Sequence, residues 1–415
     1  MKRSANIEAA GHLTRGIELI DVLPTSPALI TKDFRLHLAL GAALQATRGV
    51  GAPETVRAYT RAQDLLRRRG SLRDHVAVLR GLWNGYFIRG RLREALGVLG
   101  HCKSLATRDN NEEALALTNR LMGISVHMMG RFIEAKSHLE QSLAFYTANQ
   151  ERDASAHFAY LTDDRVGAMS YFTRTLWLLG HPETARRIGS EALADARMRG
   201  HAMTIATALL GNLFVAMGTH DCQVAVIVDE LLKHSLENRL ASYEFWATLF
   251  QGVLMAARGN DQGIEIMRRA MATADNVGSA VSRPAALGQL ARALARLDRL
   301  ESACEALDQA IAAAQAMEAR EYAAELRRLR GAIFLRMGKV RDAERELREA
   351  ITIAREQHAR WWELRTATSL ARLWRDQGKH AQARDLLAPI YGWFTEGFDT
   401  LDLKKAKALL DELCA

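Results

Sequence analysis

Residues 326–343 read LRRLRGAIFLRMGKVRDA, and this stretch decides the fold. It holds an apolar helical segment, Gly338 and, five residues later, Ala343. Glycine ends a helix in the left-handed conformation at little cost, and a small alanine on the following helix lets two backbones approach. The stretch therefore predicts a helix, a tight turn and a second helix packed on the first. The same phrase recurs at Arg89-Gly90…Ala95, Met129-Gly130…Ala135, Leu179-Gly180…Ala185 and Gln377-Gly378…Ala383.

The spacing of this phrase identifies a repeat. With looser copies at Gly49, Gly218, Gly259 and Asp298, the successive intervals are 41, 40, 50, 38, 41, 39, 40 and 40 residues. Most repeats also carry a small residue seven positions before the turn, with Trp83 and Thr173 as exceptions. These small residues are Ala42, Gly123, Gly211, Gly252, Ala291, Gly331 and Ala371. Small residues at fixed stations are typical of tetratricopeptide-like helix pairs.

The predicted fold is all-α, a right-handed superhelical solenoid of about nine tetratricopeptide-like helix hairpins with a period of about 40 residues. We expect residues 1–415 to form a single array. Its expected parts are a leading helix and linker at 1–30, repeats 1–3 at 31–148, an inserted loop at 149–162, repeats 4–9 at 163–395 and a C-terminal capping helix at 396–415. The inserted loop is either a plain surface connection or a segment folding over the groove.

Composition indicates a folded, reduced, cytoplasmic protein. Charged residues make up 25% and hydrophobic residues 48% of the chain, and the net charge of +8 is spread along its length. No run of about 18 apolar residues indicates a membrane span, and the start MKRSANIEAA lacks the apolar core of a signal peptide. The cysteines are far apart in the sequence, which disfavours disulfides or a zinc site. They are Cys102, Cys222, Cys304 and Cys414.

Catalytic motifs are missing from the sequence. Gly338-Lys339 and Gly378-Lys379 continue into Val340 and His380, so neither belongs to a phosphate-binding loop. We find no His-Glu-x-x-His and no Gly-x-Ser-x-Gly. The sequence therefore predicts a protein that is not an enzyme and holds no metal or cofactor.

The concave groove is the predicted binding site, because the first helix of each tetratricopeptide pair lines it. Projecting back from each turn by 2, 3, 6, 10 and 13 residues gives a small, apolar front with Ala39, Ala43 and Ala46. The predicted binding residues are Arg80, Asn84, Arg120, Arg174, Trp177, Asn212, Trp246, Arg292, Arg296, Arg328, Arg336, Arg365, Arg372 and Arg375. The C-terminal half of the predicted groove, from Arg292 to Arg375, is basic. Because guanidinium groups bind carboxylates and phosphates, this half favours an acidic peptide, an anionic ligand or a nucleotide-bearing domain. The alternative is that these arginines only solvate exposed helix faces.

Several stretches resemble a known family. They are LALGAALQATRG at 38–49, LWLLGHP at 176–182, ATSLARLWRDQG at 367–378 and LAPIYGWFTEGFDT at 387–400. Together they resemble the C-terminal tetratricopeptide region of large bacterial signalling proteins. Those proteins join a class III adenylate/guanylate cyclase domain, or a winged-helix domain, to an AAA-type ATPase module.

The resemblance covers essentially the whole chain, and its C-terminal phrase is the specific part. It implies an interaction or regulatory scaffold, with cyclase or ATPase chemistry residing in other domains. The expected partner is a protein or peptide, such as a cyclase/ATPase module; a membrane is not expected and nucleic acid is disfavoured. The alternative is a repeat domain that senses a small ligand and controls a cyclase or a transcription-regulator ATPase.

Overall fold

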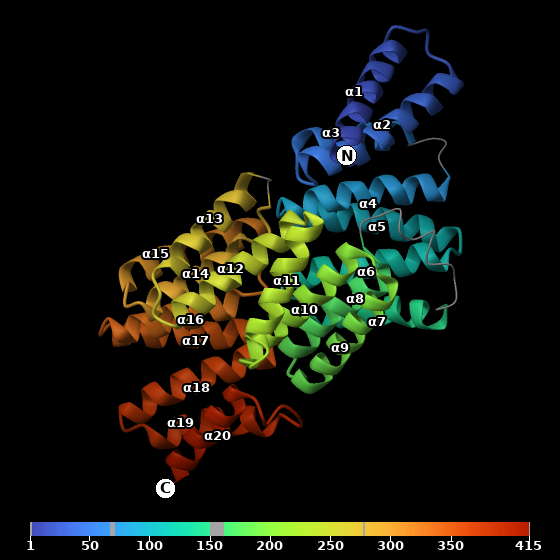
Figure 1. The fold of residues 1–415 in the computed structure, drawn as a ribbon. Coiled ribbons are helices and arrows are strands. Elements are labelled where there is room, and N and C mark those ends of the chain that lie inside the picture. Colours follow the sequence, from blue (N-terminus) through green and yellow to red (C-terminus); the bar gives the residue numbers. More distant parts are fainter. Residues whose placement is uncertain (1, 67–70, 150–161, 277–278, 415) are drawn as a thin grey trace. The chain divides into compact units, whose positions relative to one another are not determined.

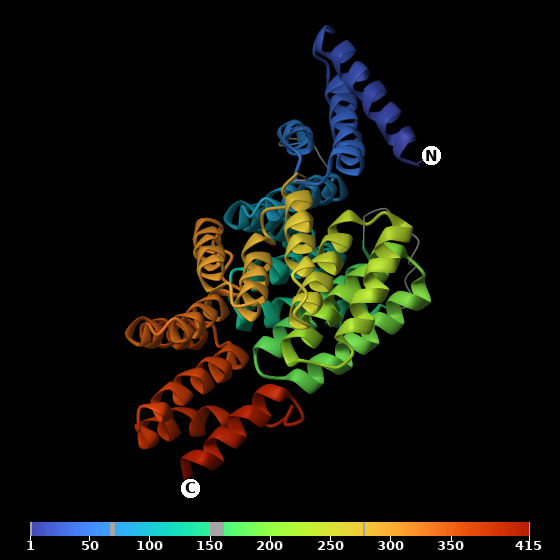
Figure 2. The same ribbon diagram turned by 60° about the vertical axis from the view of Figure 1, so that its left-hand side comes forward.

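The computed structural model describes residues 2–66, 71–149, 162–276 and 279–414 of the chain (Figure 1). Twenty α-helices and no strand occur in these ranges, so the all-α class is confirmed. Apart from α1 (Lys2–Asp21) and α20 (Leu401–Cys414), the helices come as nine consecutive pairs. Figures 1 and 2 show them as antiparallel hairpins.

The nine pairs agree with the predicted tetratricopeptide-like hairpins, usually to within a few residues. They are α2 (Pro27–Arg48) and α3 (Pro53–Leu66), α4 (Leu72–Ile88) and α5 (Leu92–Arg108), α6 (Glu112–Met128) and α7 (Phe132–Ala148), α8 (Asp164–Leu178) and α9 (Pro182–Arg199), α10 (Ala202–Thr219) and α11 (Val224–Asn238), α12 (Ala241–Ala257) and α13 (Gln262–Asn276), α14 (Arg283–Arg296) and α15 (Leu300–Met317), α16 (Ala323–Arg336) and α17 (Val340–Glu356), and α18 (Arg360–Asp376) and α19 (His380–Gly392).

The turn glycines behave as the repeat predicts. Gly90, Gly130, Gly338 and Gly378 have φ between 72° and 76°, and each follows the first helix of its pair. The alanine five residues after the turn is fully buried in each of the five clear copies of the phrase. These are Ala95, Ala135, Ala185, Ala343 and Ala383, each 0% exposed. The hairpin contact is therefore made through these alanines, as predicted.

Two positions of the repeat differ from the prediction. Gly218 is not a turn residue: it lies inside α10, and His220 takes the left-handed conformation with φ 57°. In the first pair, Ala42 is exposed, whereas its neighbour Gly41 is buried beneath the ring of Tyr59. α2 also begins at Pro27, before the expected residue 31, because Ser26 Oγ accepts a hydrogen bond from the Leu29 amide.

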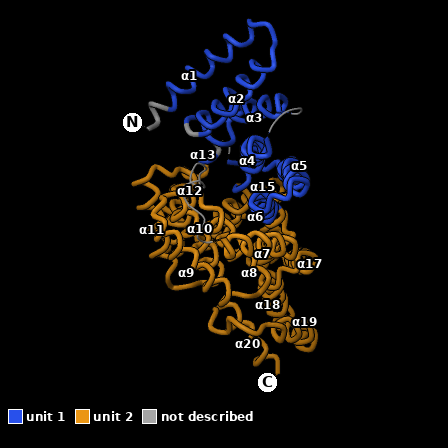
Figure 3. Tube along the Cα trace, turned by 90° about the vertical axis from the view of Figure 1, so that its right-hand side faces the viewer, with its two compact units in different colours: residues 1–125, 272–282 blue, residues 126–271, 283–415 orange. Residues whose placement is uncertain are grey.

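The chain divides into two compact units, coloured separately in Figure 3. Unit 1 comprises residues 1–125 and 272–282, and unit 2 comprises residues 126–271 and 283–415. In unit 1 the core gathers Phe34, Tyr59, Leu66, Val78 and Leu82 from α2, α3 and α4. The inserted loop predicted at 149–162 lies almost entirely outside the described residues.

Unit 2 holds the most apolar helix of the described chain. Contrary to the sequence prediction, α10 has the length and the mean hydropathy, 1.5, of a membrane-spanning helix. Its neighbours α8, α9, α11 and α12 cover it, and 61% of its residues are buried. Packing inside unit 2 therefore accounts for the apolar character of α10.

Candidate functional site

The first helices of the unit 2 hairpins form a closed ring. α8 contacts α10, and contacts then continue through α12, α14, α16 and α18, which returns to α8. We call these six helices the ring. Arg174, Trp177, Arg292, Arg328 and Arg365 of the predicted groove lie on these helices, so we take the interior of the ring as the candidate site.

Glu321, which lies just before α16, crosses the interior of the ring to α8. Its Oε1 accepts a hydrogen bond from Arg174 Nη2 at 2.6 Å and lies 2.9 Å from His127 Nε2. All three side chains are buried. Burial alone would raise the pKa of Glu321, but Arg174 and His127 outweigh it and lower the pKa to about 2. Glu321 is therefore a carboxylate that joins the turn before α16 to Arg174 of α8 and His127 of α6.

Glu325, one turn further along α16, faces three guanidinium groups. Arg292 Nη2 donates to its Oε1 at 2.8 Å, and Arg328 donates to both carboxylate oxygens at 2.7 and 2.8 Å. Arg365 Nη1 lies 3.6 Å from Oε1. Burial would raise the pKa of Glu325, but Arg328, Arg365 and Arg292 lower it to about 2. The single carboxylate of Glu325 thus faces three guanidinium groups, of which Arg365 is also paired with Asp402.

Arg365 connects this group to the C-terminal helix α20. It donates to Asp402 Oδ2 from Nε at 2.9 Å and from Nη2 at 2.7 Å, and it also donates to the Gly218 carbonyl of α10. His220 lies beside it, with 3.2 Å between His220 Nε2 and Arg365 Nη2. Burial and Arg365 together lower the pKa of His220 to about 4, so this imidazole is neutral at pH 7.

Aromatic side chains fill the centre of the ring. Trp177 is 2% exposed and lies against Gly218, and its ring centroid is 5.1 Å from that of Trp362. Arg174 lies over the Phe214 ring at 4.1 Å, a cation–π contact. A cavity of about 10 Å³, near the size of one water molecule, lies between α8, α10, α12, α14, α18 and Tyr322, which directly precedes α16. The interior is therefore packed rather than open.

A second contact closes unit 2 near the C-terminus of the chain. Glu396 accepts hydrogen bonds from the Glu183 and Thr184 amides at 3.0 and 3.1 Å, at the first turn of α9. Arg186 of α9 binds both carboxylate oxygens of Asp399, at 2.9 and 3.0 Å. A carboxylate at a helix N-terminus satisfies free amides and is favoured by the helix dipole. We call residues 393–400 the latch.

The structure brings together Arg174, Trp177, Arg292, Arg328 and Arg365 from the predicted groove. Asn212 instead donates to the Gly189 carbonyl at 3.0 Å, and half-buried Trp246 packs on Phe214. At the C-terminal end, Arg336 pairs with Asp298 at 2.7 Å. Arg375 pairs with Glu412 and Asp376, whereas Arg296 is exposed.

Arg372 differs from these arginines. Its guanidinium is half-buried and makes no hydrogen bond or ion pair in the part of the chain that the structure describes. Burial and neighbouring Arg375 lower its pKa, and Arg328 acts in the same direction. Arg372 lies seven residues after Arg365, two helical turns along the same face of α18. It therefore lies on the inward side of the ring as a cation without a direct acidic partner among the described residues.

The predicted groove residues of the front half belong to unit 1. Arg80 and Asn84 are half-buried on α4, and Arg120 is buried on α6. Ala39 is exposed and Ala43 buried on α2, while the side chain of Ala46 lies outside the described part. These residues are thus not part of the ring in unit 2.

Sequence reasoning missed the two glutamates of the ring. Glu325 lies 13 residues before Gly338, and Arg365 lies 13 residues before Gly378. The spacing rule that places Arg365 in the groove therefore places Glu325 there as well. The prediction names only basic residues in the last three pairs and does not name their buried acidic partners. Glu321 has no such signal, because it lies in the turn before α16.

Comparison with known proteins supports the fold. No protein-family model and no curated protein matches the sequence. Among solved structures, the APC/C hetero-tetramer Cut9–Hcn1 has a TM-score of 0.58 at 13% identity, over 98% of this chain and 68% of that chain. The apo quorum sensor NprR from B. thuringiensis has a TM-score of 0.49 at 11% identity, over 87% and 98% of the two chains. A Rap protein complexed with Competence and Sporulation Factor has a TM-score of 0.44 at 11% identity, over 99% of both chains.

Proposed function

We propose that the chain is a non-catalytic regulatory module that binds an acidic protein or peptide segment at the C-terminal side of its ring. The observation that carries this proposal is the arginine excess there: Arg292, Arg328 and Arg365 share the carboxylates of Glu325 and Asp402, and Arg372 has no direct acidic partner among the described residues. A carboxylate from a partner would pair with Arg372, because guanidinium groups bind carboxylates in a bidentate manner.

The test is a titration of the full chain with a short fluorescein-labelled peptide of alternating Glu and Ala, followed by fluorescence anisotropy. Replacing Arg372 by Glu is expected to weaken binding by about tenfold or more, and added salt weakens wild-type binding. The matched control is Arg345→Glu, since Arg345 is an exposed arginine on α17 whose one acidic partner among the described residues is Asp342. Equal affinity of wild type and Arg372→Glu contradicts the proposal, as does an equal loss in the control.

We further propose that the module serves a bacterial cyclase or ATPase signalling system and acts in the cytoplasm. The resemblance of residues 367–400 to such proteins supports this setting. Its test is to add the chain to a purified cyclase or ATPase encoded beside its gene. A change in the rate of that enzyme which Arg372→Glu abolishes supports the proposal, and an unchanged rate contradicts it.

Small-ligand sensing is a second candidate function, suggested by two buried polar atoms near the centre of the ring. Trp177 and Gln289 line the central cavity, and Trp177 Nε1 and Gln289 Oε1 have no hydrogen-bond partner among the described residues. Because the cavity has room for about one water molecule, sensing at this place requires the ring to widen around the ligand. Saturable thermal stabilisation of the full chain by a metabolite, lost in Gln289→Leu, favours sensing over peptide binding.

A further inference from the structure

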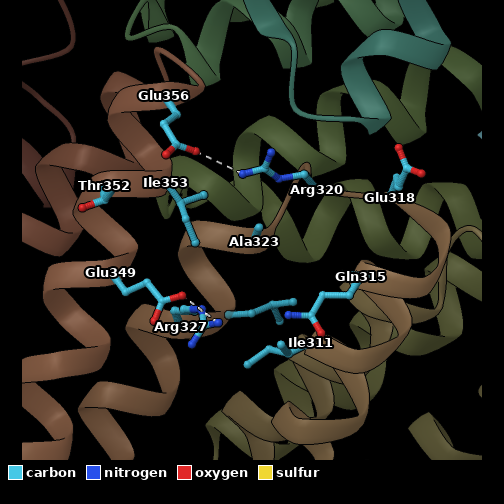
Figure 4. A pocket seen from close by; sticks show the side chains of 12 residues that line it. Ile311, Gln315, Glu318, Arg320, Ala323, Arg327, Glu349, Thr352, Ile353 and Glu356 are labelled. Atoms are coloured by element: carbon cyan, nitrogen blue, oxygen red, sulfur yellow. Dashed lines mark hydrogen bonds and ion pairs between the residues drawn. The ribbon is translucent and has the colours of Figure 1, made fainter.

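The outer side of unit 2 carries a groove that is distinct from the ring interior. It lies between α15, α16 and α17 and has a volume of about 480 Å³ (Figure 4). That volume lies within the range of ligand-binding pockets. Ala323, Leu326 and Arg327 line it from α16, whereas Glu325 and Arg328 of the same helix face the ring. The helical spacing places these two sets on different sides of α16.

The floor of the groove is aliphatic. Ile311 and Ala314 come from α15, Ala323 and Leu326 from α16, and Ile353 from α17. Leu326 and Ala314 are buried, whereas Ile311, Ala323 and Ile353 remain half-buried. Apolar side chains that keep contact with water along a concave surface are stabilised by an apolar group placed on them.

The rim of the groove is charged, and carboxylates outnumber guanidiniums. Arg320 pairs with Glu356 at one end at 3.2 Å, and Arg327 pairs with Glu349 at the other end at 2.8 Å (Figure 4). Glu318 also lies on the rim. Both arginines are thus already neutralised, and Arg327 has Glu346 as a further partner at 3.1 Å.

The helix α15, which forms one wall of the groove, extends this negative charge. Between Leu300 and Met317 it carries three exposed carboxylates, Glu301, Glu305 and Asp308, and neither Lys nor Arg; of these, Asp308 is paired with Arg330 of α16 at 2.7 Å. This composition is notable in a chain whose net charge is +8. The acidic wall and rim around an aliphatic floor are complementary to a cationic segment with an apolar side chain.

We propose that the groove between α15, α16 and α17 is a docking site for a basic protein segment that inserts an aliphatic or aromatic anchor residue. The anchor packs on Leu326, Ile353 and Ile311, and lysines or arginines beside it meet Glu349, Glu356 and Glu318. This site stands independently of the proposed acidic ligand of the ring, since the two surfaces take partners of opposite charge.

The test uses the full chain and a fluorescein-labelled peptide in which Leu and Lys recur at helical spacing. Two matched probes carry uncharged Gln in place of Lys, or Ala in place of Leu. Fluorescence anisotropy is expected to show saturable binding of the Leu/Lys probe and at least about tenfold weaker binding of both matched probes. Absence of saturable Leu/Lys binding overturns the proposal, and so does equal binding of the Gln-containing or the Ala-containing probe.

Variants locate the binding in the groove. Ala323→Phe fills the floor and Glu349→Lys reverses the rim charge, and each is expected to weaken the Leu/Lys probe by about tenfold. Glu237→Lys makes the same charge change at an exposed position of α11, which does not line the groove, and is expected to leave the affinity within about twofold. If circular dichroism shows that Ala323→Phe lowers the helix content, the result for exposed Glu349→Lys decides the test alone. Wild-type affinity in Glu349→Lys, or an equal loss in Glu237→Lys, overturns the proposal.

Discussion

Arg174 and Glu321 are 147 residues apart in the chain, yet Arg174 Nη2 donates to Glu321 Oε1 at 2.6 Å inside the ring. This contact joins α8, the first helix of one hairpin, to the turn that precedes α16, four hairpins later. Tetratricopeptide-like repeats need only contact their immediate neighbours. The Arg174–Glu321 pair therefore links two hairpins that are not neighbours in the array, which the stacking of successive repeats does not require.

Removing Arg174 is expected to destabilise unit 2 strongly. Arg174→Ala leaves the Glu321 carboxylate buried next to His127 alone, and breaking a buried pair in this way lowers the free energy of unfolding by about 3–5 kcal/mol. Urea unfolding followed by tryptophan fluorescence measures this loss, since Trp177 and Trp362 lie in the ring. Arg345→Ala, which removes an exposed pair with Asp342, is expected to change it by no more than about 1 kcal/mol. Similar losses in both variants would contradict the buried role of Arg174.

Adding a methyl group at Gly218 is expected to lower stability. A Cβ there would lie 2.1 Å from Trp177 Cζ2, so Gly218→Ala forces the Trp177 ring or α10 to move. Overpacking of this kind costs about 1–3 kcal/mol in the free energy of unfolding.

Gly100 of α5 is the matched control for this substitution. Apart from its sequence neighbours and the backbone of α5, no atom of the described residues lies within 4 Å of the position of its Cβ, and Gly100→Ala is expected to stabilise the chain by about 0.5–1 kcal/mol. Opposite signs for the two glycine-to-alanine changes, measured by thermal unfolding, support the close approach of Trp177 to Gly218. A stabilising Gly218→Ala contradicts it.

The glutamates of the ring make stability depend on acid pH. The ordinary pKa of Glu325 is 4.5, and its pKa in the folded chain is about 2. Because the folded pKa is lower, the unfolded chain binds the proton first, and the stabilisation present above about pH 4.5 is lost as pH falls toward 2. Glu325→Gln is expected to be less stable than wild type at pH 7 and to lose less stability over this range. Urea midpoints at several pH values measure this, with exposed Glu301→Gln as control. A variant curve parallel to wild type contradicts the linkage.

The latch is expected to protect the first turn of α9. Glu396→Gln removes the negative charge that accepts from the Glu183 and Thr184 amides, and exchange of these amides is expected to rise by roughly twofold to fivefold. Amide hydrogen exchange measures this directly. Arg187→Gln, which breaks an exposed pair with Glu191 in the same helix, serves as the control. Unchanged protection of residues 183 and 184 in Glu396→Gln is the contrary result.

Hairpins were predictable from the sequence because their cause is local. A glycine at the turn and an alanine five residues later are sufficient to place the two helices, as at Gly338 and Ala343. Gly218 shows where this reasoning fails. It occurs at the spacing expected for a turn glycine, but it lies inside α10, where the absence of a side chain makes room for the Trp177 ring. A glycine needed for close packing cannot be distinguished by spacing from a glycine needed for positive φ.

Closure of the ring could not be predicted, because it depends on contacts between repeats that are distant in sequence. The projection found Arg174 and Arg365 as inward residues, and both lie inside the ring. It did not show that Glu321 and Glu325 would reach them, since the curvature of the array decides which repeats meet. Whether the predicted arginines bind a partner stays a prediction, for which Arg372 is the sharpest test.

Amide hydrogen exchange of the full chain tests the closed ring most directly. Replacing Arg174 by Ala on α8 is expected to raise exchange in α18 (Arg360–Asp376), which is remote in sequence, as well as in α8 itself. Arg345→Ala is expected to leave both helices protected. If exchange of α18 stays at its wild-type level when Arg174 is removed, the ring is not held together through this buried network.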